Sequence, residues 1–203
     1  MIPQYIAVLS VFITLTAISF YVRDILRGTT KPNLVSWFMW FLAPVVAAGV
    51  SFSEGAGISA LPVFMAGFGP IVVLLVAIRN KNYYWRLGIV DYACLALSLL
   101  ALLSWVLFRA SVWATVLAVL ADGIAFIPTY IKSWQNPNTE TLAPYFSGSI
   151  NSSISILTLP LVFFVTAGFA VYLIFGNLIE IGILLLRRNL HKKWPKTEEN
   201  LSS

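Results

Sequence analysis

Three side chains that could bind a polar solute or exchange a proton lie inside long apolar stretches of the sequence. Asp122 falls in the middle of one stretch, and Asn177 and Glu180 fall in another. An ionised carboxylate at the centre of a membrane helix costs about 2.5–3.5 kcal/mol on insertion scales, so such residues normally face a cavity or a partner. We expect Asp122 and Asn177 to lie at similar depth and to face one polar cavity. A structural hydrogen bond between their two helices is the alternative.

Smaller polar residues recur at helical spacing around these three. Thr129 follows Asp122 by seven residues, so both lie near one face of a helix, and Ser147, Asn151 and Ser155 share a face of the next apolar stretch. Hydroxyl side chains also serve helix packing in membranes, which is the alternative here. The predicted substrate path consists of Asp122, Asn177, Asn151, Ser147, Ser155, Thr14 and Thr129. Asp122 and Glu180 are the candidates for proton coupling.

Proline and glycine inside apolar stretches mark candidate hinges. An interior proline removes one backbone hydrogen bond and can kink its helix. The candidate hinge residues are Pro128, Pro44, Pro70 and Gly69. The segment Gly67–Pro70 predicts a broken helix, with a counterpart at residues 175–178. Such breaks point to a binding site or a hinge, and close helix packing is the alternative.

The composition excludes a water-soluble enzyme domain. The chain has 203 residues, of which 59% are hydrophobic and 10% charged, whereas soluble domains are about 45–50% apolar and about 25% charged. One cysteine and one histidine exclude an internal disulfide and a Cys/His metal cluster. The sequence shows no nucleophile–base pair and no phosphate loop. We therefore expect no enzyme activity, no cofactor, no metal and no nucleic-acid partner.

The apolar stretches predict an all-α integral membrane protein with seven transmembrane helices. A bilayer core needs about 20 apolar residues per helix. The predicted spans are Gln4–Tyr21, Leu34–Ser51, Ser59–Ile78, Leu87–Phe108, Val112–Lys132, Leu142–Phe163 and Ala167–Leu186. The boundary between the last two spans is the least defined, since only Pro160 and Gly168 interrupt the helix pattern there.

The distribution of Lys and Arg predicts the orientation. Every one of the 13 Lys and Arg residues except Arg109 falls after the first, third or fifth span or in the C-terminal tail. Basic loops stay in the cytoplasm. We therefore expect the N-terminus outside and the C-terminus in the cytoplasm, most simply of the plasma membrane.

A weak internal repeat supports this topology. The segment Phe20–Leu34 aligns without a gap with Pro128–Leu142, at an offset of 108 residues. The same offset pairs Thr14 with Asp122, Trp37 with Tyr145, and Gly69 with Asn177. Two three-helix units can keep the same orientation only if one span links them. The predicted domains are therefore a first bundle at 1–80, a linker helix at 81–110, a second bundle at 111–188 and a basic tail at 189–203.

One loop carries a family resemblance. Pro128, Thr129 and Lys132, followed by Asn138 to Leu142 with its Thr139-Glu140 pair, resemble the motif of the PQ-loop family, which includes the SWEET and SemiSWEET sugar carriers. The sequence departs from the motif in having Thr129 for glutamine, and Phe20-Tyr21 for Pro-Gln in the first copy. The resemblance implies two three-helix bundles in a 3+1+3 parallel repeat. It also implies a substrate site between them that opens alternately to each side.

The resemblance leaves the substrate open. The family's sugar carriers pair an Asn on the third helix of each bundle with a Trp on the second, and Asn177 fits one Asn while its repeat mate is Gly69. We place Trp37 and Trp40 at the membrane interface as anchors, which disfavours a sugar relative to an amino acid or another small polar solute. Other branches of the family export amino acids with protons, a role that would suit Asp122. A non-transporting receptor or partner-binding protein on the same fold is the alternative function, and the oligomeric state is left open.

Overall fold

The computed structural model describes residues 3–81, 83, 89–108 and 111–193. Some side chains of the helix at 89–108, and those of 191–193, are also outside the description. Parts of three predicted domains lie outside the described residues, including positions 1–2 of the first bundle and 82 of the linker. The longer stretches are positions 84–88 and 109–110 around the linker helix, and 194–203 in the basic tail.

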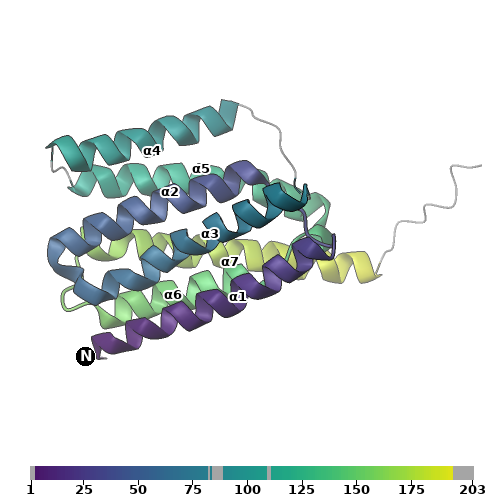
Figure 1. Ribbon diagram of the computed structural model, residues 1–203, viewed down its shortest axis with the longest axis horizontal. Coiled ribbons are helices and arrows are strands. Elements are labelled where there is room, and N and C mark those ends of the chain that lie inside the picture. The colour runs from purple at the N-terminus through teal and green to yellow at the C-terminus, as the bar shows by residue number, and fades with distance from the viewer. Residues whose placement is uncertain (1–2, 82, 84–88, 109–110, 194–203) are drawn as a thin grey trace, which may run out of the picture.

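The described ranges fold into α-helices and short helical turns, with no β-strand among them (Figure 1). The short turns cover Gln4–Val8, Phe52–Ala56, Gly57–Ala60 and Pro137–Thr139. The long helices are α1 (Leu9–Leu26), α2 (Leu34–Ser51), α3 (Leu61–Asn80), α4 (Ile89–Phe108), α5 (Ser111–Gln135), α6 (Ala143–Thr158) and α7 (Phe164–Lys193). The prediction of an all-helical chain is confirmed for these ranges.

Four helical stretches are long and apolar enough to cross a membrane. They are Gln4–Leu26, Leu34–Asn80, Ser111–Gln135 and Phe164–Leu190. The second contains both α2 and α3. The chain reverses between them at Gly55 and Gly57, whose φ angles of 90° and 55° are costly for residues with a Cβ.

The later helices differ from the predicted spans at their ends. Helix α6 stops at Thr158 rather than Phe163, because Leu159 precedes Pro160 and takes an extended conformation. With 16 residues it is about 24 Å long, short of a bilayer core of about 30 Å. Helix α7 begins at Phe164 rather than Ala167. It continues to Lys193, past the expected end at Leu186, because its polar C-terminal residues still favour a helix.

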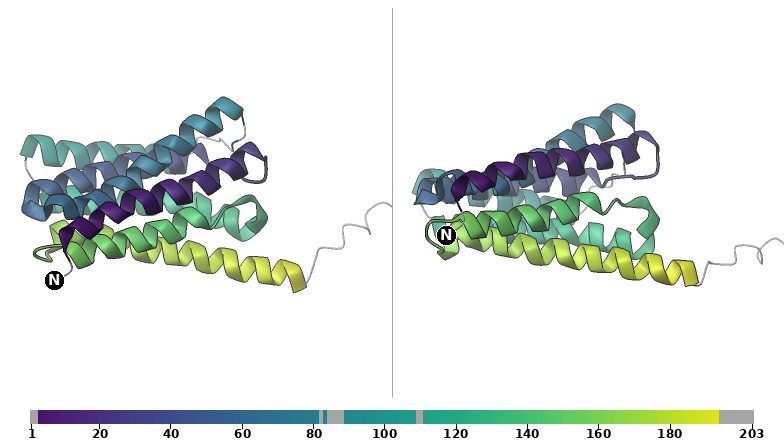
Figure 2. Two further views of the ribbon diagram at one scale, coloured as in Figure 1. Left: turned by 60° about the horizontal axis from the view of Figure 1, so that its bottom comes forward. Right: turned by 90° about the horizontal axis from the view of Figure 1, so that it is seen from below.

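The helices pack in two corresponding patterns (Figures 1 and 2). Helix α3 packs against α1 and α2, and α7 packs against α5 and α6. Between these groups, α1 packs against α6 and α2 packs against α5. Helix α4 lies at one side of the molecule, against α5 and α2.

The outer surface of the molecule is rich in large apolar side chains, whereas several polar side chains are buried inside it. Large apolar side chains such as Phe12, Leu75 and Phe175 are more than 60% exposed, while Asp122, Asn151 and Glu180 are 1% exposed or less. This is the arrangement expected of a protein whose surroundings are hydrocarbon. Together with the long apolar helices, it identifies a membrane protein.

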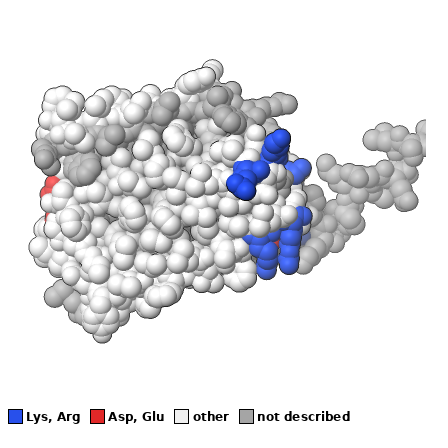
Figure 3. Space-filling view, viewed as in Figure 1, with Lys and Arg blue, Asp and Glu red and all other residues white. Residues whose placement is uncertain are grey.

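Charged side chains gather at one end of the bundle (Figure 3). We call this the basic end. The described basic side chains that end or follow α1, α3 and α5, or that lie in the last part of α7, belong to it: Arg23, Arg27, Lys31, Arg79, Lys81, Lys132, Arg187 and Arg188. Glu54 belongs to the opposite end, in the turn between α2 and α3.

The predicted break in the third apolar stretch is wrong. Helix α3 is continuous from Leu61 to Asn80 and includes Pro70. The glycines near Pro70 serve close packing: a Cβ on Gly67 would lie 2.9 Å from the Phe41 carbonyl oxygen, and one on Gly69 would lie 2.9 Å from Ile18. The segment 175–178 is likewise continuous helix within α7.

Substituting Gly67 tests this close approach of α2 and α3. We expect Gly67→Ala to destabilise the protein by about 1–3 kcal/mol, because the Phe41 carbonyl is backbone and cannot rotate away from the new methyl group. The measurement is the thermal unfolding midpoint in detergent. Gly182→Ala is the matched control, since a Cβ there meets nothing within 4 Å. Equal midpoints for the two variants would contradict the packing argument.

Candidate functional site

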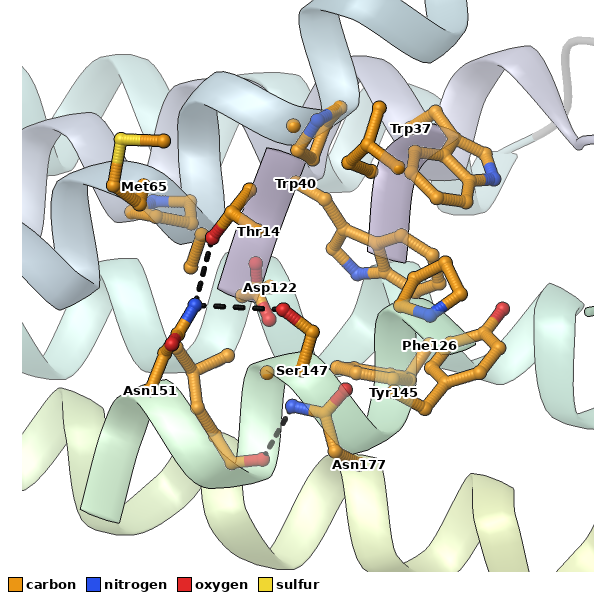
Figure 4. Close-up of a pocket in the computed structure, with 18 residues that line it drawn as sticks. Thr14, Trp37, Trp40, Met65, Asp122, Phe126, Tyr145, Ser147, Asn151 and Asn177 are labelled. Atoms are coloured by element: carbon orange, nitrogen blue, oxygen red, sulfur yellow. Dashed lines mark hydrogen bonds between the residues drawn. The ribbon is translucent and has the colours of Figure 1, made fainter. Parts of the chain in front are cut away.

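A cavity of about 70 Å³ lies between the two groups of helices (Figure 4). From α1–α3 its walls are formed by Thr14, Ile18, Trp37, Trp40, Pro44, Met65, Ala66, Gly69 and Pro70. From α5–α7 they are formed by Asp122, Phe126, Pro144, Tyr145, Ser147, Gly148, Asn151, Leu173 and Asn177.

Among the described residues, Asp122 is the only charged one that lines this cavity. It is completely buried, and its Oδ2 accepts a hydrogen bond of 3.0 Å from the Tyr172 hydroxyl on α7. Its Oδ1 has no hydrogen-bond partner in the described part of the chain. Asp122 therefore links α5 to α7 through one oxygen and leaves the other available to a ligand in the cavity.

Asn151 connects the facing helices α1 and α6 across the cavity. Its Nδ2 donates to the Thr14 hydroxyl at 2.7 Å and to the Ser147 hydroxyl at 3.4 Å (Figure 4). It also lies 3.5 Å from the Ser10 carbonyl, which can only accept and so fixes the orientation of the amide. The Oδ1 of Asn151 has no partner among the described residues.

Asn177 occupies space that a side chain at position 148 would fill. Its Nδ2 donates to the Leu173 carbonyl at 2.7 Å. A Cβ on Gly148 would lie 2.7 Å from that nitrogen. The absence of a side chain at 148 thus lets Asn177 reach the cavity from α7.

Aromatic rings separate the cavity from the basic end. Trp40 lies 4.6 Å from Phe126 and 6.2 Å from Tyr145, measured between ring centroids. Trp37 packs edge-on against Trp40 at 5.5 Å and lies 4.6 Å from Tyr21. The expected placement of Trp37 and Trp40 as interfacial anchors is wrong, because they are only 2% and 7% exposed. Nε1 of Trp40 is buried without a partner in the described chain.

Several expected path and hinge residues lie outside the cavity. Thr129 donates to the Ser36 hydroxyl at 3.2 Å, between α5 and α2, and Ser155 donates to the Ser59 carbonyl at 2.7 Å. Glu180 accepts a hydrogen bond from Ser133 and is buried between α7 and α5. Pro128 borders a separate hollow near Lys31 and Lys132 at the basic end. The cavity brings together Thr14, Asp122, Ser147, Asn151 and Asn177 with Pro44, Gly69 and Pro70.

A buried carboxylate closes the basic end. Glu140, 3% exposed, accepts hydrogen bonds from Tyr21 at 2.6 Å and from Tyr145 at 2.9 Å, and it forms an ion pair with Lys132. Tyr21 belongs to α1 whereas Glu140 precedes α6, so the carboxylate ties the two groups of helices together. Charge-assisted bonds of this kind are about twice as strong as neutral ones. Arg188 adds a bond to the Glu140 carbonyl.

The two loops at this end are also bonded to each other. The hydroxyls of Thr30 and Thr141 lie 2.7 Å apart, and Thr141 donates to Asp24 at 2.9 Å. The backbone N–H of Lys31 donates to the Thr139 carbonyl at 3.3 Å. The loop after α1 and the loop after α5 therefore form one joined lid over the aromatic rings.

Hydroxyl groups close the opposite end. Ser59, just before α3, donates to the Thr158 carbonyl of α6 at 2.7 Å and accepts from Ser155 through its own carbonyl. Ser51 of α2 donates to the Thr166 carbonyl of α7 at 3.2 Å. The polar face of α6 is thus divided: Ser147 and Asn151 line the cavity, while Ser155 and Thr158 join helices beyond it.

Sequence analysis missed Trp40 and Tyr172 as site residues. Trp37, Trp40 and Pro44 are spaced three and four residues apart, which places them on one helix face with the cavity. That spacing is a signal in the sequence by which Trp40 can be assigned to the cavity. Tyr172 carries no comparable signal, because an aromatic residue in an apolar helix is ordinary core.

Comparisons with protein-family models, curated proteins and solved structures give no match. In the described residues no group of three His, Cys, Asp or Glu side chains is placed to hold a metal ion.

The role of Glu140 can be tested by cross-linking the lid. In a chain whose single cysteine is removed by Cys94→Ser, the double variant Thr30→Cys/Thr141→Cys places two sulfur atoms where hydroxyls lie 2.7 Å apart. We expect rapid disulfide formation with a mild oxidant. Adding Glu140→Gln should slow it several-fold, because the charge-assisted bonds from Tyr21, Tyr145 and Lys132 are weakened.

Glu54→Gln is the matched control for that experiment, because it removes a carboxylate at the opposite end. The readout is the shift in gel mobility with time of oxidation. Unchanged cross-linking in the Glu140→Gln background would show that the carboxylate does not hold the lid closed.

Proposed function

We propose that the protein is a small-solute transporter of the PQ-loop/SWEET type, working by alternating access between two three-helix bundles, 1–80 and 111–188. In this proposal all seven long helices span the plasma membrane in a 3+1+3 parallel repeat, and α4 is the linker. The N-terminus is outside and the basic end is cytoplasmic. The substrate is a small polar solute, and Asp122 is the group available for proton coupling.

The composition of the cavity carries this proposal. Six pairs of lining residues are 108 positions apart, the offset of the sequence repeat. These pairs are Thr14 with Asp122, Ile18 with Phe126, Trp37 with Tyr145, Trp40 with Gly148, Met65 with Leu173, and Gly69 with Asn177. Equivalent positions on two repeats that meet at one central cavity are the arrangement expected of a carrier built from repeats.

The helix packing supports the same arrangement. Under the offset, α1, α2 and α3 correspond to α5, α6 and α7. The contacts of α3 with α1 and α2 are repeated by α7 with α5 and α6, and the contact of α1 with α6 is repeated by α5 with α2. Two units packed in this way can rock against each other without breaking their internal contacts.

The closures give the proposal its two gates. One closure depends on Glu140 and the joined loops, and the other depends on Ser59 and its partners on α6. A cavity with a closing contact at each end suits an occluded intermediate of transport. The basic side chains at the first gate favour a cytoplasmic location for it, since basic loops are retained there.

Reconstituted protein tests the proposal directly. The variant with Thr30→Cys, Thr141→Cys and Cys94→Ser is placed in liposomes, and tracer counterflow is measured for a panel of sugars, amino acids, small organic acids and small amines. We expect at least one solute to exchange. Oxidation should abolish the exchange, and a reducing agent should restore it, because the disulfide locks the cytoplasmic gate.

The same liposomes carry a pH-sensitive dye, and Asp122→Asn is measured in parallel. A solute-dependent pH change that the variant loses is the expected result for a proton-coupled carrier. The Cys94→Ser protein is the control for oxidation. If no solute exchanged although the protein was folded and correctly oriented, transport would be excluded and the receptor function would be favoured. Exchange that survives the disulfide would contradict alternating access at this gate.

A further inference from the structure

The charge and hydrogen-bonding groups of the cavity define a ligand more closely than its size does. Among the described lining residues only Asp122 has an ionisable carboxyl group, and none of them is a Lys, Arg or His that could pair with an anion. Transferring a carboxylate-bearing solute into this cavity, which is lined largely by buried side chains, would place it near Asp122 without a compensating cation. Like charges at close range are strongly unfavourable in a medium of low dielectric constant. The lining therefore disfavours anions, and also zwitterions whose carboxylate would remain unpaired.

The partnerless atoms of the lining specify the complementary groups. In the described part of the chain these atoms are two acceptors, Oδ1 of Asp122 and Oδ1 of Asn151, and one donor, Nε1 of Trp40. Each is buried, so each gains free energy when a ligand supplies its hydrogen-bond partner. A ligand that matches them offers at least two N–H or O–H donors and one acceptor. A primary ammonium group has three donors, and a hydroxyl group can accept.

The aromatic wall favours a cation as well. Trp40, Phe126 and Tyr145 line the cavity with centroid distances of 4.6 Å and 6.2 Å from the tryptophan ring to the other two. The faces of such rings attract an organic cation within about 6 Å, most strongly where water is excluded. The described Arg and Lys side chains gather at the basic end (Figure 3), and none of them lines the cavity.

The groups around Asp122 leave its charge without another compensating partner. Helix α7 contributes Tyr172, its hydrogen-bond donor, and Glu180, a second carboxyl that is held by Ser133. Helix α5 itself contributes Tyr130, whose hydroxyl donates to the Gly176 carbonyl. Helix α2 carries no titratable residue, and on α4 Tyr92 is exposed while the Asp91 side chain lies outside the description. No described cationic side chain contacts Asp122.

We propose that the solute is a compact organic cation, an ammonium group on a short hydroxylated skeleton without a carboxylate, and that it competes with a proton for Asp122. Binding the ammonium ion to the protonated carboxyl group releases one proton to water and leaves an ion pair in the cavity. The reverse step returns the proton to Asp122 and releases the cation. This inference rests on the proposed function and makes the transporter an electroneutral exchanger of one amine cation for one proton.

Competition with a proton fixes the direction of the pH dependence. Protonated Asp122 has no charge for the ammonium ion, so lowering the pH weakens binding and raising it strengthens binding. In the range where the carboxyl group is protonated, the apparent affinity should fall about tenfold per pH unit. Calorimetry in two buffers with different protonation enthalpies should then report close to one proton released per amine bound.

Four probes with the same two-carbon skeleton separate charge from size. Ethanolamine is the cation, ethylene glycol is neutral, glycine is the zwitterion and glycolate is the anion. We expect radiolabelled ethanolamine to bind the purified protein and to be displaced only by excess ethanolamine among the four. Counterflow in liposomes should show the same selectivity. Protein-free liposomes correct for passage of the neutral amine.

Three variants identify the binding group. Asp122→Asn keeps an oxygen for Tyr172 but removes the charge, and we expect it to lower ethanolamine affinity at least tenfold and to remove the pH dependence. Tyr172→Phe keeps the charge and should retain pH-dependent binding, which a purely structural role of Asp122 would not predict. Glu54→Gln, which removes a carboxylate at the opposite end, should bind like the unmodified chain. A size-exclusion profile confirms that each variant is folded.

The outcomes separate this inference from the proposed transporter. Ethanolamine binding that is unchanged in Asp122→Asn, or that ethylene glycol displaces equally well, would overturn the amine site. Counterflow of glycine or a sugar that persists in Asp122→Asn would also overturn it, while the transporter would stand. Selective ethanolamine binding without any counterflow would support the amine site and overturn transport.

Discussion

The structure depends on a constraint that hydrocarbon imposes: a polar side chain in the membrane must find its partner inside the protein. The hydrophobic effect contributes little to association between helices whose surroundings are equally apolar, so close packing and interhelical hydrogen bonds hold them together. Here the links between helices are accordingly polar, from Tyr172 with Asp122 in the interior to Ser59 with Thr158 at one end. The strongest set surrounds Glu140, where an ion pair and two phenol hydroxyls meet. The few polar atoms left without partners lie mainly at the cavity, which is why they indicate a ligand rather than a packing fault.

The two closures differ in chemistry and therefore in strength. At the basic end the contacts include a buried carboxylate, while at the opposite end they are hydroxyl-to-carbonyl bonds, which contribute about 1 kcal/mol each. An occluded protein with closures of this kind should open more readily at the end opposite the basic end, where Ser51 and Ser59 form the closing bonds. A signal that neutralised Glu140 would weaken the closure at the basic end, and the protein would then open more often at that end. The direction of net transport would still follow from the gradients, since the closures change only the populations of states.

Residue type and periodicity predicted the helices well, because a run of apolar residues in a membrane has few other ways to satisfy its backbone. They also singled out Asp122, Asn151 and Asn177, which line one cavity. The sequence did not reveal that α3 stays helical through Pro70, because its glycines are used by neighbours that only the fold brings close. Nor did it distinguish a buried tryptophan from an interfacial one. Trp40 lies inward because the helices around it enclose it, and that enclosure is not a local property of the sequence.

The two walls of the cavity have diverged, and this has a consequence for how such a chamber can be assembled. Residues of α1–α3 supply a wall that is apolar except for Thr14 and Nε1 of Trp40, whereas α5–α7 supply the carboxyl group and both amides. A symmetric dimer of the first unit would enclose a nearly uncharged space. A symmetric dimer of the second would set two carboxylates against each other, and one of them would have to be neutralised. Joining both units in one chain allows a single, unopposed acid, which identical subunits related by a twofold axis cannot provide.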